Sequence, residues 1–412
     1  MTTKTIAIVG TLDTKGAEFR YLKEQIEQRG HRTLVINAGV QGEPFFEPDV
    51  SAAEVARAGG VPLEQLRERA DRGESVATMA KGAATIAARL YAEGRIHGIV
   101  SLGGSAGTTI GTSAMRALPV GVPKLMVSTL TSGNVGPYVQ TKDIAMMYSV
   151  VDIAGLNQIS RRILANAAGA IVGMVETEVP SSVEDRPLIG ATMFGVTTPC
   201  VTRAREVLEQ AGYEVLVFHA TGTGGRAMED LIRAGFFCGV LDVTTTEWAD
   251  ELVDGVLSAG PERLDAAAEM GIPQVVAPGA LDMVNFGPPE TVPEKFRGRR
   301  FYQHNPNVTL MRTTPEENRK LGEIIARKLS AAKGPVVFFF PKKGVSAIDR
   351  EGQPFYWPEA DAAFLEGFKA HVAPHVRVVE MDAHINDPEF AEAMAQTLLS
   401  LLRSQEKEGK AS

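Results

Sequence analysis

The chain contains two similar copies of one strand–helix–strand pattern, and this repeat limits the possible folds more than any other feature. In the first copy, an apolar run over residues 4–9 leads into a helical stretch over residues 16–29, then a glycine and a second apolar run over residues 32–36. The same order begins again at residue 188. The pattern indicates a βαβ unit, in which a helix joins two parallel strands.

The two copies also share residues at matching positions. Residues 24–36 (EQIEQRGHRTLVI) and 206–218 (EVLEQAGYEVLVF) are identical at six of thirteen positions. Further along, HGIVSLGG in the first half matches CGVLDVTT in the second, and GVPKLMVSTLTSGNV matches GIPQVVAPGALDMVN. Any two α/β domains share patterns of this kind, but three matches in the same order favour duplication.

We therefore predict an α/β fold with two doubly wound, mainly parallel-sheet Rossmann-like domains related by duplication. A length of 412 residues suits two such domains, and the polar segment PSSVEDRP places their boundary near residues 180–187. The first half carries an insertion over about residues 40–74. We expect a first domain over residues 1–182, a second domain with a C-terminal extension over 183–405, and a disordered tail over 406–412.

Composition and charge exclude several classes of protein. The net charge is -8 with acids and bases interspersed, so no basic stripe indicates a nucleic-acid partner. Cys200 and Cys238 have no metal-ligand spacing and suit a reducing compartment. The N-terminus enters a strand directly, without a signal peptide, and the longest apolar stretch, residues 163–175, is too short to span a bilayer. We expect a cytoplasmic protein without a membrane partner.

Small, polar, glycine-rich loops follow the predicted strands of the first domain. In an open parallel sheet, ligands bind beyond the carboxyl ends of the strands, so we expect these loops to converge at one edge. The four loops are GTLDTKG at 10–16, NAG at 37–39, LGGSAGTTIG at 102–111 and STLTSGNVG at 128–136.

Loops of this composition suit a phosphate group. Glycine lets the backbone approach an anion closely, and free amide groups at a helix start point toward it. Lys15 would neutralise phosphate charge, and Asp13 would hold a magnesium ion directly or through water. Neither G-x-x-x-x-G-K-[ST] nor G-x-G-x-x-G follows the first strand. The alternative for GTLDTKG is an ordinary helix start capped by Asp13 or Thr14. The loops also offer hydroxyl donors on Ser105, Thr108, Thr109, Thr131 and Ser132.

The corresponding loops of the second half are richer in histidine and acidic residues. HATGTGG, DVTTTE and PGALDMVN follow its predicted strands, and FYQHNP lies further along the chain. This composition suggests acid/base chemistry on a different ligand. An equally good explanation of His219 is a strand-end histidine bonded to the backbone. The candidate catalytic residues are His219, Asp242, Glu247 and His304.

Two further arrangements have weaker support. Ser346 and His384 suggest a hydrolase triad, but GVSAI does not match G-x-S-x-G. A metal site formed by His219, His304, His384 and nearby acids would lack an i,i+4 pair of ligands.

With these motifs in view, the chain resembles the uncharacterised protein family related to the tomato mosaic virus resistance protein, whose N-terminal part is an ATP-binding domain. The resemblance covers nearly the whole chain. It rests on six segments that are specific together and weak singly: VGTLDTKG, SLGGSAGTT, STLTSGNV, HNPNVTLMRTT, KGVSAID and DAHINDP.

The resemblance implies ATP with magnesium in the first domain, a two-domain Rossmann-like architecture, and a homodimer or higher homo-oligomer. It implies no accepted catalytic reaction. By the match of motifs, it assigns nucleotide binding to Gly10, Thr11, Asp13, Lys15, Gly103, Gly104, Ser105, Gly107, Thr108 and Asn134.

The sequence leaves three functions open. The leading hypothesis is an ATP–magnesium-binding protein with a second small-molecule site in the second domain or in the cleft between the domains. The rival is a metabolic enzyme of lyase or hydrolase type, acting on a phosphorylated or carboxylated metabolite, with ATP as a regulator or a mimic of the true ligand. The third is a non-catalytic interaction protein, because the plant relative acts by binding a viral replication protein.

Overall fold

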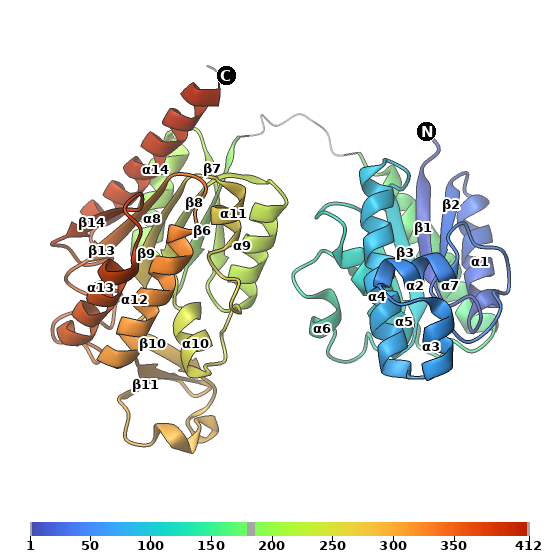
Figure 1. Cartoon of the computed structure of the whole chain (residues 1–412), viewed down its shortest axis with the longest axis horizontal. Helices are drawn as coiled ribbons and strands as arrows, with labels where there is room; N and C mark the ends of the chain where they lie inside the picture. The colour runs from blue at the N-terminus through green and yellow to red at the C-terminus, as the bar shows by residue number, and fades with distance from the viewer. Residues whose placement is uncertain (1, 179–185, 410–412) are drawn as a thin grey trace. The chain divides into compact units, whose positions relative to one another are not determined.

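The chain forms two compact units, residues 1–182 and residues 183–412. The computed structural model describes residues 2–178 and 186–409 (Figure 1). The predicted boundary segment, residues 180–187, lies mostly outside the described residues.

The first unit is built on a five-stranded sheet in the order β2-β1-β3-β4-β5, with every neighbouring pair parallel. The strands are β1 (Thr5–Gly10), β2 (Arg32–Asn37), β3 (Gly98–Gly103), β4 (Lys124–Ser128) and β5 (Ala145–Tyr148). The helices are α1 (Gly16–Glu27), α2 (Ala52–Gly59), α3 (Leu63–Arg69), α4 (Arg72–Ala92), α5 (Ser105–Arg116), α6 (Gly136–Val139) and α7 (Gln158–Glu176).

Helices cover both faces of this sheet, because alternate residues of each strand point to opposite sides. Ala7 and Val9 pack with α2, α3, α4 and α5, whereas Ile6 and Ile8 pack with α1 and α7 (Figure 1). The strands read as continuous apolar runs since both faces are buried. The unit is doubly wound, as predicted.

The second unit is built on a six-stranded sheet in the order β14-β13-β9-β8-β6-β7, again parallel throughout. The strands are β6 (Leu188–Met193), β7 (Glu214–His219), β8 (Phe237–Thr244), β9 (Gln274–Gly279), β13 (Val336–Pro341) and β14 (Arg377–Met381). The helices are α8 (Thr198–Gln210), α9 (Thr223–Arg233), α10 (Glu247–Val253), α11 (Ala266–Met270), α12 (Pro315–Ser330), α13 (Pro358–His371) and α14 (Pro388–Gly409).

Among the described residues, only the second unit has a separate three-stranded antiparallel sheet. It has the order β10-β12-β11, and two short 3-10 helices precede β11. The strands are β10 (Met283–Phe286), β11 (Phe301–Asn305) and β12 (Val308–Arg312), and the 3-10 helices are η1 (Pro289–Thr291) and η2 (Glu294–Phe296).

The two parallel sheets share their first five strands in the same order, which supports duplication. Equivalent backbone hydrogen bonds recur in both. Ile99 N–H donates to Pro123 O at 2.9 Å, and its counterpart Val240 N–H donates to Pro273 O at 2.9 Å. The glycine that ends the first helix of each copy has positive φ, 87° at Gly30 and 94° at Gly212. Only glycine adopts such a conformation without strain, which explains its recurrence.

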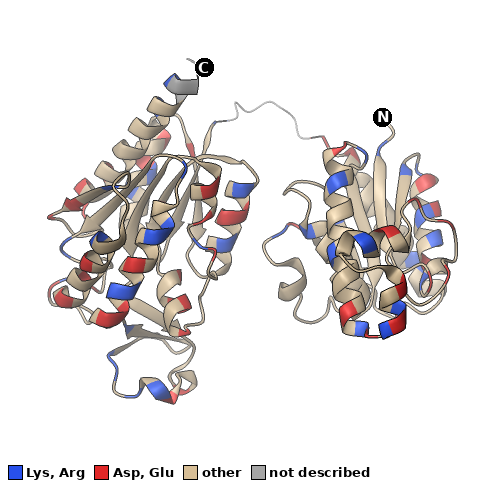
Figure 2. Ribbon diagram, in the orientation of Figure 1, with Lys and Arg blue, Asp and Glu red and all other residues tan. Residues whose placement is uncertain are grey.

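The C-terminal helix is longer than expected. Helix α14 continues to Gly409, so the disordered tail expected from residue 406 is wrong for residues 406–409; residues 410–412 lie outside the described part. Among the helices of the described residues, none is both long and apolar enough to cross a bilayer. Acidic and basic residues are interspersed along the ribbons of both units (Figure 2).

Candidate functional site

The first unit holds a pocket of about 720 Å³ at the carboxyl ends of β1, β2 and β3. Three of the four glycine-rich loops contribute to it: residues 11–15 after β1, residues 38–41 after β2, and residues 103–107 after β3. Pockets of 300–1,000 Å³ are typical of small-molecule and cofactor sites. The position is the one at which open parallel sheets bind ligands.

Seven of the ten predicted nucleotide-binding residues line this pocket: Thr11, Asp13, Lys15, Gly103, Gly104, Ser105 and Gly107. The other three, Gly10, Thr108 and Asn134, are not among the lining residues. A Cβ at Gly10 would lie 1.8 Å from Phe19 Cζ, so this glycine makes room for the Phe19 ring. Thr108 is buried and shares a 2.7 Å hydrogen bond with Ser128 Oγ. Asn134 is exposed and accepts from Gly136 N–H at 3.0 Å.

Helix α5 begins in the wall of the pocket without a capping side chain. Its N-cap is Gly104, and no side chain accepts from the first-turn amides there. Such amides need an acceptor, which an anionic ligand can supply. A Cβ at Gly103 would lie 2.8 Å from Gly107 Cα, so this turn is tight enough to require glycine. Ser105 is exposed at the first turn.

Asp13 is fixed by the loop after β2 rather than by helix α1. Its Oδ2 accepts from Gln41 N–H at 2.8 Å and from Gly42 N–H at 3.2 Å. The expected capping of α1 by Asp13 or Thr14 is therefore wrong, since the N-cap is Lys15 and makes no side-chain cap. The other oxygen, Oδ1, is buried and has no hydrogen-bond partner among the described residues.

A magnesium ion fits this unpartnered oxygen. Carboxylate oxygen is a preferred ligand of Mg²⁺, which commonly takes one or two carboxylates and completes its shell with water and phosphate. Within residues 2–178 and 186–409, no cluster of three or more His, Cys, Asp or Glu could hold a metal by itself. Asp13 would therefore share the ion with the ligand.

Two charged residues that are far apart in the sequence, Lys15 before α1 and Asp152 after β5, both line the pocket. Lys15 Nζ donates to the Ile153 carbonyl oxygen, which ties the start of α1 to the segment after β5. Asp152 lines the pocket, and its Oδ1 accepts from Ile153 N–H at 2.8 Å. Sequence reasoning missed Asp152, which follows β5, a strand that it did not predict.

A segment made of α3, α4 and the turn between them, which begins inside the insertion over residues 40–74 and extends past it, forms the remaining wall. Sequence reasoning also missed this wall. Helices α3 and α4 meet at Ala70, a non-glycine residue with φ of 50°, and Asp71 caps α4 by accepting from Glu74 N–H at 2.7 Å. The lining residues from this segment are Leu66, Arg67, Ala70, Asp71, Arg72, Ser75, Val76 and Met79.

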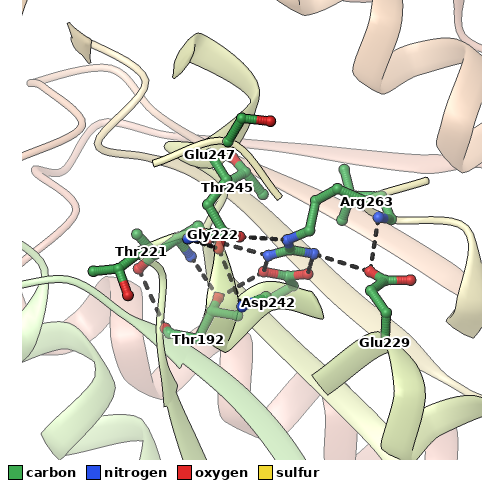
Figure 3. Close-up of polar contacts among 12 residues, drawn as sticks. Thr192, Thr221, Gly222, Glu229, Asp242, Thr245, Glu247 and Arg263 are labelled. Carbon is green, nitrogen blue, oxygen red and sulfur yellow. Dashed lines mark hydrogen bonds and ion pairs between the residues drawn. The ribbon is translucent and has the colours of Figure 1, made fainter. Parts of the chain in front are cut away.

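In the second unit, Asp242 and Glu247 lie together around one buried arginine. Arg263 Nη1 donates to Asp242 Oδ2 at 2.6 Å and Nη2 to Asp242 Oδ1 at 2.7 Å, while its Nε donates to Glu247 Oε2 at 2.7 Å (Figure 3). Glu229 is a third carboxylate, 3.2 Å from Arg263 Nη1. All four side chains are at most 6% exposed.

The electrostatics of this Arg263 cluster follow from burial. Removal from water raises the pKa of Glu229, although Arg263 and the Leu264 and Ala266 amides oppose the shift. Burial alone would lower the pKa of Arg263, but the surrounding carboxylates raise it well above its ordinary value. Glu247 Oε1 also accepts from Gly222 N–H at 2.7 Å and Gly225 N–H at 3.1 Å, at the start of α9.

The structure does not bring the two predicted catalytic histidines to this cluster. His219 is exposed at the end of β7, with its ring stacked on Phe194 at a centroid distance of 5.3 Å. His304 is exposed on β11, in the antiparallel sheet. In the described part of the chain, neither ring is hydrogen-bonded to Asp242 or Glu247. Arg263, which sequence reasoning missed, lies in a loop with no recognisable motif.

The segments with Ser346 and His384 form another buried cluster, but not a triad. Ser346 Oγ donates to Asp282 Oδ2 at 2.8 Å, whereas the His384 ring contacts the Ser346 backbone oxygen at 2.8 Å. Arg312 bridges Asp349 and Asp361. Burial, reinforced by the nearby Asp349 carboxylate, raises the pKa of Asp282 to about 7.

Models of one family match both halves of the chain. Residues 4–180 match the Uncharacterised protein family (UPF0261) N-terminal domain, and residues 186–402 match the UPF0261 C-terminal domain. A "UPF0261 protein" from Clostridium tetani is 58% identical over 97% of this chain and 99% of its own length. The "ToMV resistance protein Tm-1(GCR237)" of Solanum lycopersicum is 41% identical over 95% of this chain and 55% of its own length.

Among solved structures, a UDP-N-acetylglucosamine 2-epimerase from Rickettsia bellii aligns over 98% of this chain and 97% of its own. The sequence identity is 10% and the TM-score is 0.24.

Proposed function

The chain belongs to the uncharacterised protein family UPF0261, and we propose that it binds a magnesium–nucleotide, with ATP as the first candidate, in the pocket of its first unit. The single observation that carries this proposal is the uncapped start of α5, with Gly103 and Gly107 beneath it, in the same pocket as Asp13 and Lys15. The resemblance to an ATP-binding plant domain points the same way.

Each polar group of the pocket has a definite task in this proposal. The amides of the first turn of α5 and the Ser105 hydroxyl donate to phosphate oxygens. The ammonium of Lys15 balances the phosphate charge. Asp13 Oδ1 would coordinate the magnesium ion, which would help to neutralise the phosphate charge.

Calorimetric titration with ATP tests the phosphate end of the site. Ser105→Trp puts an indole at the first turn of α5, and we expect it to weaken MgATP binding by about tenfold or more, a change of about 1.4 kcal/mol. Ala117→Trp is the matched control, because Ala117 is exposed at the other end of the same helix. Unchanged affinity in Ser105→Trp would remove the α5 loop from the site.

The role of Asp13 is tested by repeating the titration with and without magnesium. Asp13→Asn keeps an oxygen that can accept from the Gln41 and Gly42 amides but loses the carboxylate charge. We expect the gain in ATP affinity on adding magnesium to fall by about tenfold. An undiminished magnesium dependence would show that the ion is held without Asp13.

The enzyme alternative has less support from the second unit. Asp242 and Glu247 are each 1% exposed and are hydrogen-bonded to Arg263, so a substrate would have to displace that arginine. A non-catalytic interaction protein remains compatible with nucleotide binding. We also propose a homodimer or higher homo-oligomer, which light scattering on the purified chain would measure.

A further inference from the structure

The pocket of the first unit has two unlike halves. The loops after β1 and β3 provide a polar half, which includes Asp13, Lys15 and Ser105. The other half is apolar and comes from the loop after β2 and from α3, α4 and α5. Its side chains belong to Ala38, Val40, Leu66, Val76, Met79 and Ile110. Such a pocket suits a ligand with an anionic group at one end and an apolar body at the other.

The apolar half is preformed and held by close helix packing. Helix α4 packs against α2 and α5. A Cβ at Gly82 would lie 1.9 Å from the Val55 oxygen, and a Cβ at Gly59 would lie 2.2 Å from the Thr78 oxygen. These glycines let α2 and α4 cross in contact, and Ser51 closes the start of α2 with a capping box. The wall therefore needs no ligand to form.

Polar groups border the apolar half. Ser75 and Arg72 line the pocket, and among the described residues their side chains have no hydrogen-bond or ion-pair partner. Asp71 uses Oδ1 to cap α4 and leaves its second oxygen available. Arg72 and Asp71 are exposed, so water can satisfy these donors and acceptors, and a ligand with polar atoms at its edge can take the place of that water. These polar groups suit the edge of a nitrogenous ring whose faces are apolar.

We infer that α3 and the first turns of α4 form the wall that recognises the base of the nucleotide, with the ring against Leu66, Val76 and Met79 and its edge toward Ser75 and Arg72. This inference rests on the proposed function, because it assumes that phosphate occupies the polar half. It assigns part of the selectivity to α3, for which the second unit has no counterpart, since β7 there leads through residues 220–222 directly to α9, the equivalent of α4.

The test compares MgATP with magnesium tripolyphosphate, which has the same charged groups and no base. Val76→Trp fills the apolar half, and we expect it to weaken MgATP binding by about tenfold or more while tripolyphosphate binding stays within about twofold. Ala77→Trp is the matched control, because Ala77 is exposed on α4 and does not line the pocket. It should change neither affinity.

The outcomes separate this inference from the proposed function. Equal weakening of both ligands by Val76→Trp, or no weakening of either, would overturn the base-recognition role while leaving the phosphate site in place. Wild-type protein that binds neither ligand would overturn both. Circular dichroism and thermal melting of each variant would show that a lost affinity is not a lost fold.

Discussion

The carboxyl edges of the two parallel sheets differ, although the sheets share the order of their first five strands. In the first unit the edge opens into a pocket beside an uncapped helix start. In the second unit the amides of Gly222 and Gly225 at the start of α9 already hold the carboxylate of Glu247. Arg263 neutralises that carboxylate from the other side. The second unit thus supplies its own anion where a ligand would otherwise bind.

A single aligned position illustrates how the two edges diverged. Ser101 on β3 donates to the Val9 oxygen at 2.7 Å, which satisfies a buried hydroxyl and leaves the edge free. Its counterpart on β8 is Asp242, which cannot be buried without a cation and is paired with Arg263. The two sheets keep the same topology after duplication. Their loops determine whether the carboxyl edge can bind a ligand or is occupied by the protein's own side chains.

Removing the central cation of the second unit should have the largest effect. Arg263→Met leaves three buried carboxylates without their cation, and we expect the unfolding free energy to fall by about 3–5 kcal/mol. Both tryptophans, Trp248 and Trp357, belong to the second unit, so their fluorescence during urea unfolding reports on this unit. Arg233→Met is the control, because Arg233 makes a partly exposed pair with Glu269 worth less than about 1 kcal/mol. Equal losses of unfolding free energy in the two variants would contradict the interpretation that Arg263 neutralises the buried carboxylates at this edge of the sheet.

The stability of the second unit should also depend on pH through Asp282. Its pKa is raised from 3.8 to about 7, so the folded state binds more protons than the unfolded state between these values. Stability is therefore highest at low pH and falls as pH rises toward 7, by at most about 1.4 kcal/mol per pH unit. Tryptophan-monitored urea unfolding at pH 5, 6 and 7 measures the slope.

Asp282→Asn should make that slope shallower without removing it. Asp250, also buried in the second unit, has a pKa raised by burial to about 7 and will titrate in the same range. A slope that is identical in Asp282→Asn and in the wild type would show that the Asp282 carboxyl does not titrate there.

In the first unit, loss of the Lys15 charge should weaken MgATP binding. The expected change in free energy is smaller than the loss of stability expected for Arg263→Met. Lys15→Met keeps much of the side-chain length and removes the ammonium, and we expect MgATP affinity to fall by roughly 1.5–3 kcal/mol, the usual worth of a hydrogen bond to a charged group. Lys23→Met is the control, because Lys23 pairs with Glu27 on the exposed face of α1. Similar affinities for the two variants would remove Lys15 from the site.

Much of the fold was predictable because periodicity and glycine positions are local signals. The doubly wound parallel sheets and their repeated order follow from strand–helix alternation, and Gly30 and Gly212 mark equivalent turns. The candidate site was predictable only in part. Loops after β1 and β3 converge as expected, but the loop after β4 turns into α6 and takes Asn134 out of the pocket lining.

The residues that sequence reasoning missed depend on distant contacts. Arg263 reaches Asp242 across 21 positions and Glu229 across 34, and nothing in its own loop indicates that it will be buried. The wall formed by α3 and the start of α4 depends on an insertion, and the packing of that insertion at the sheet edge has no local signature. Such contacts are decided by tertiary packing, which propensity and spacing do not reveal.

Hydrogen–deuterium exchange of the full chain, with and without MgATP, tests the contrast between the open and the closed edge most directly. We predict slower exchange at residues 11–15, 66–79 and 103–107, which line the first-unit pocket, and no change at residues 222–225, where Glu247 holds the amides. Protection at residues 222–225, or none at residues 103–107 under saturating MgATP, would contradict the assignment of the ligand to the first unit.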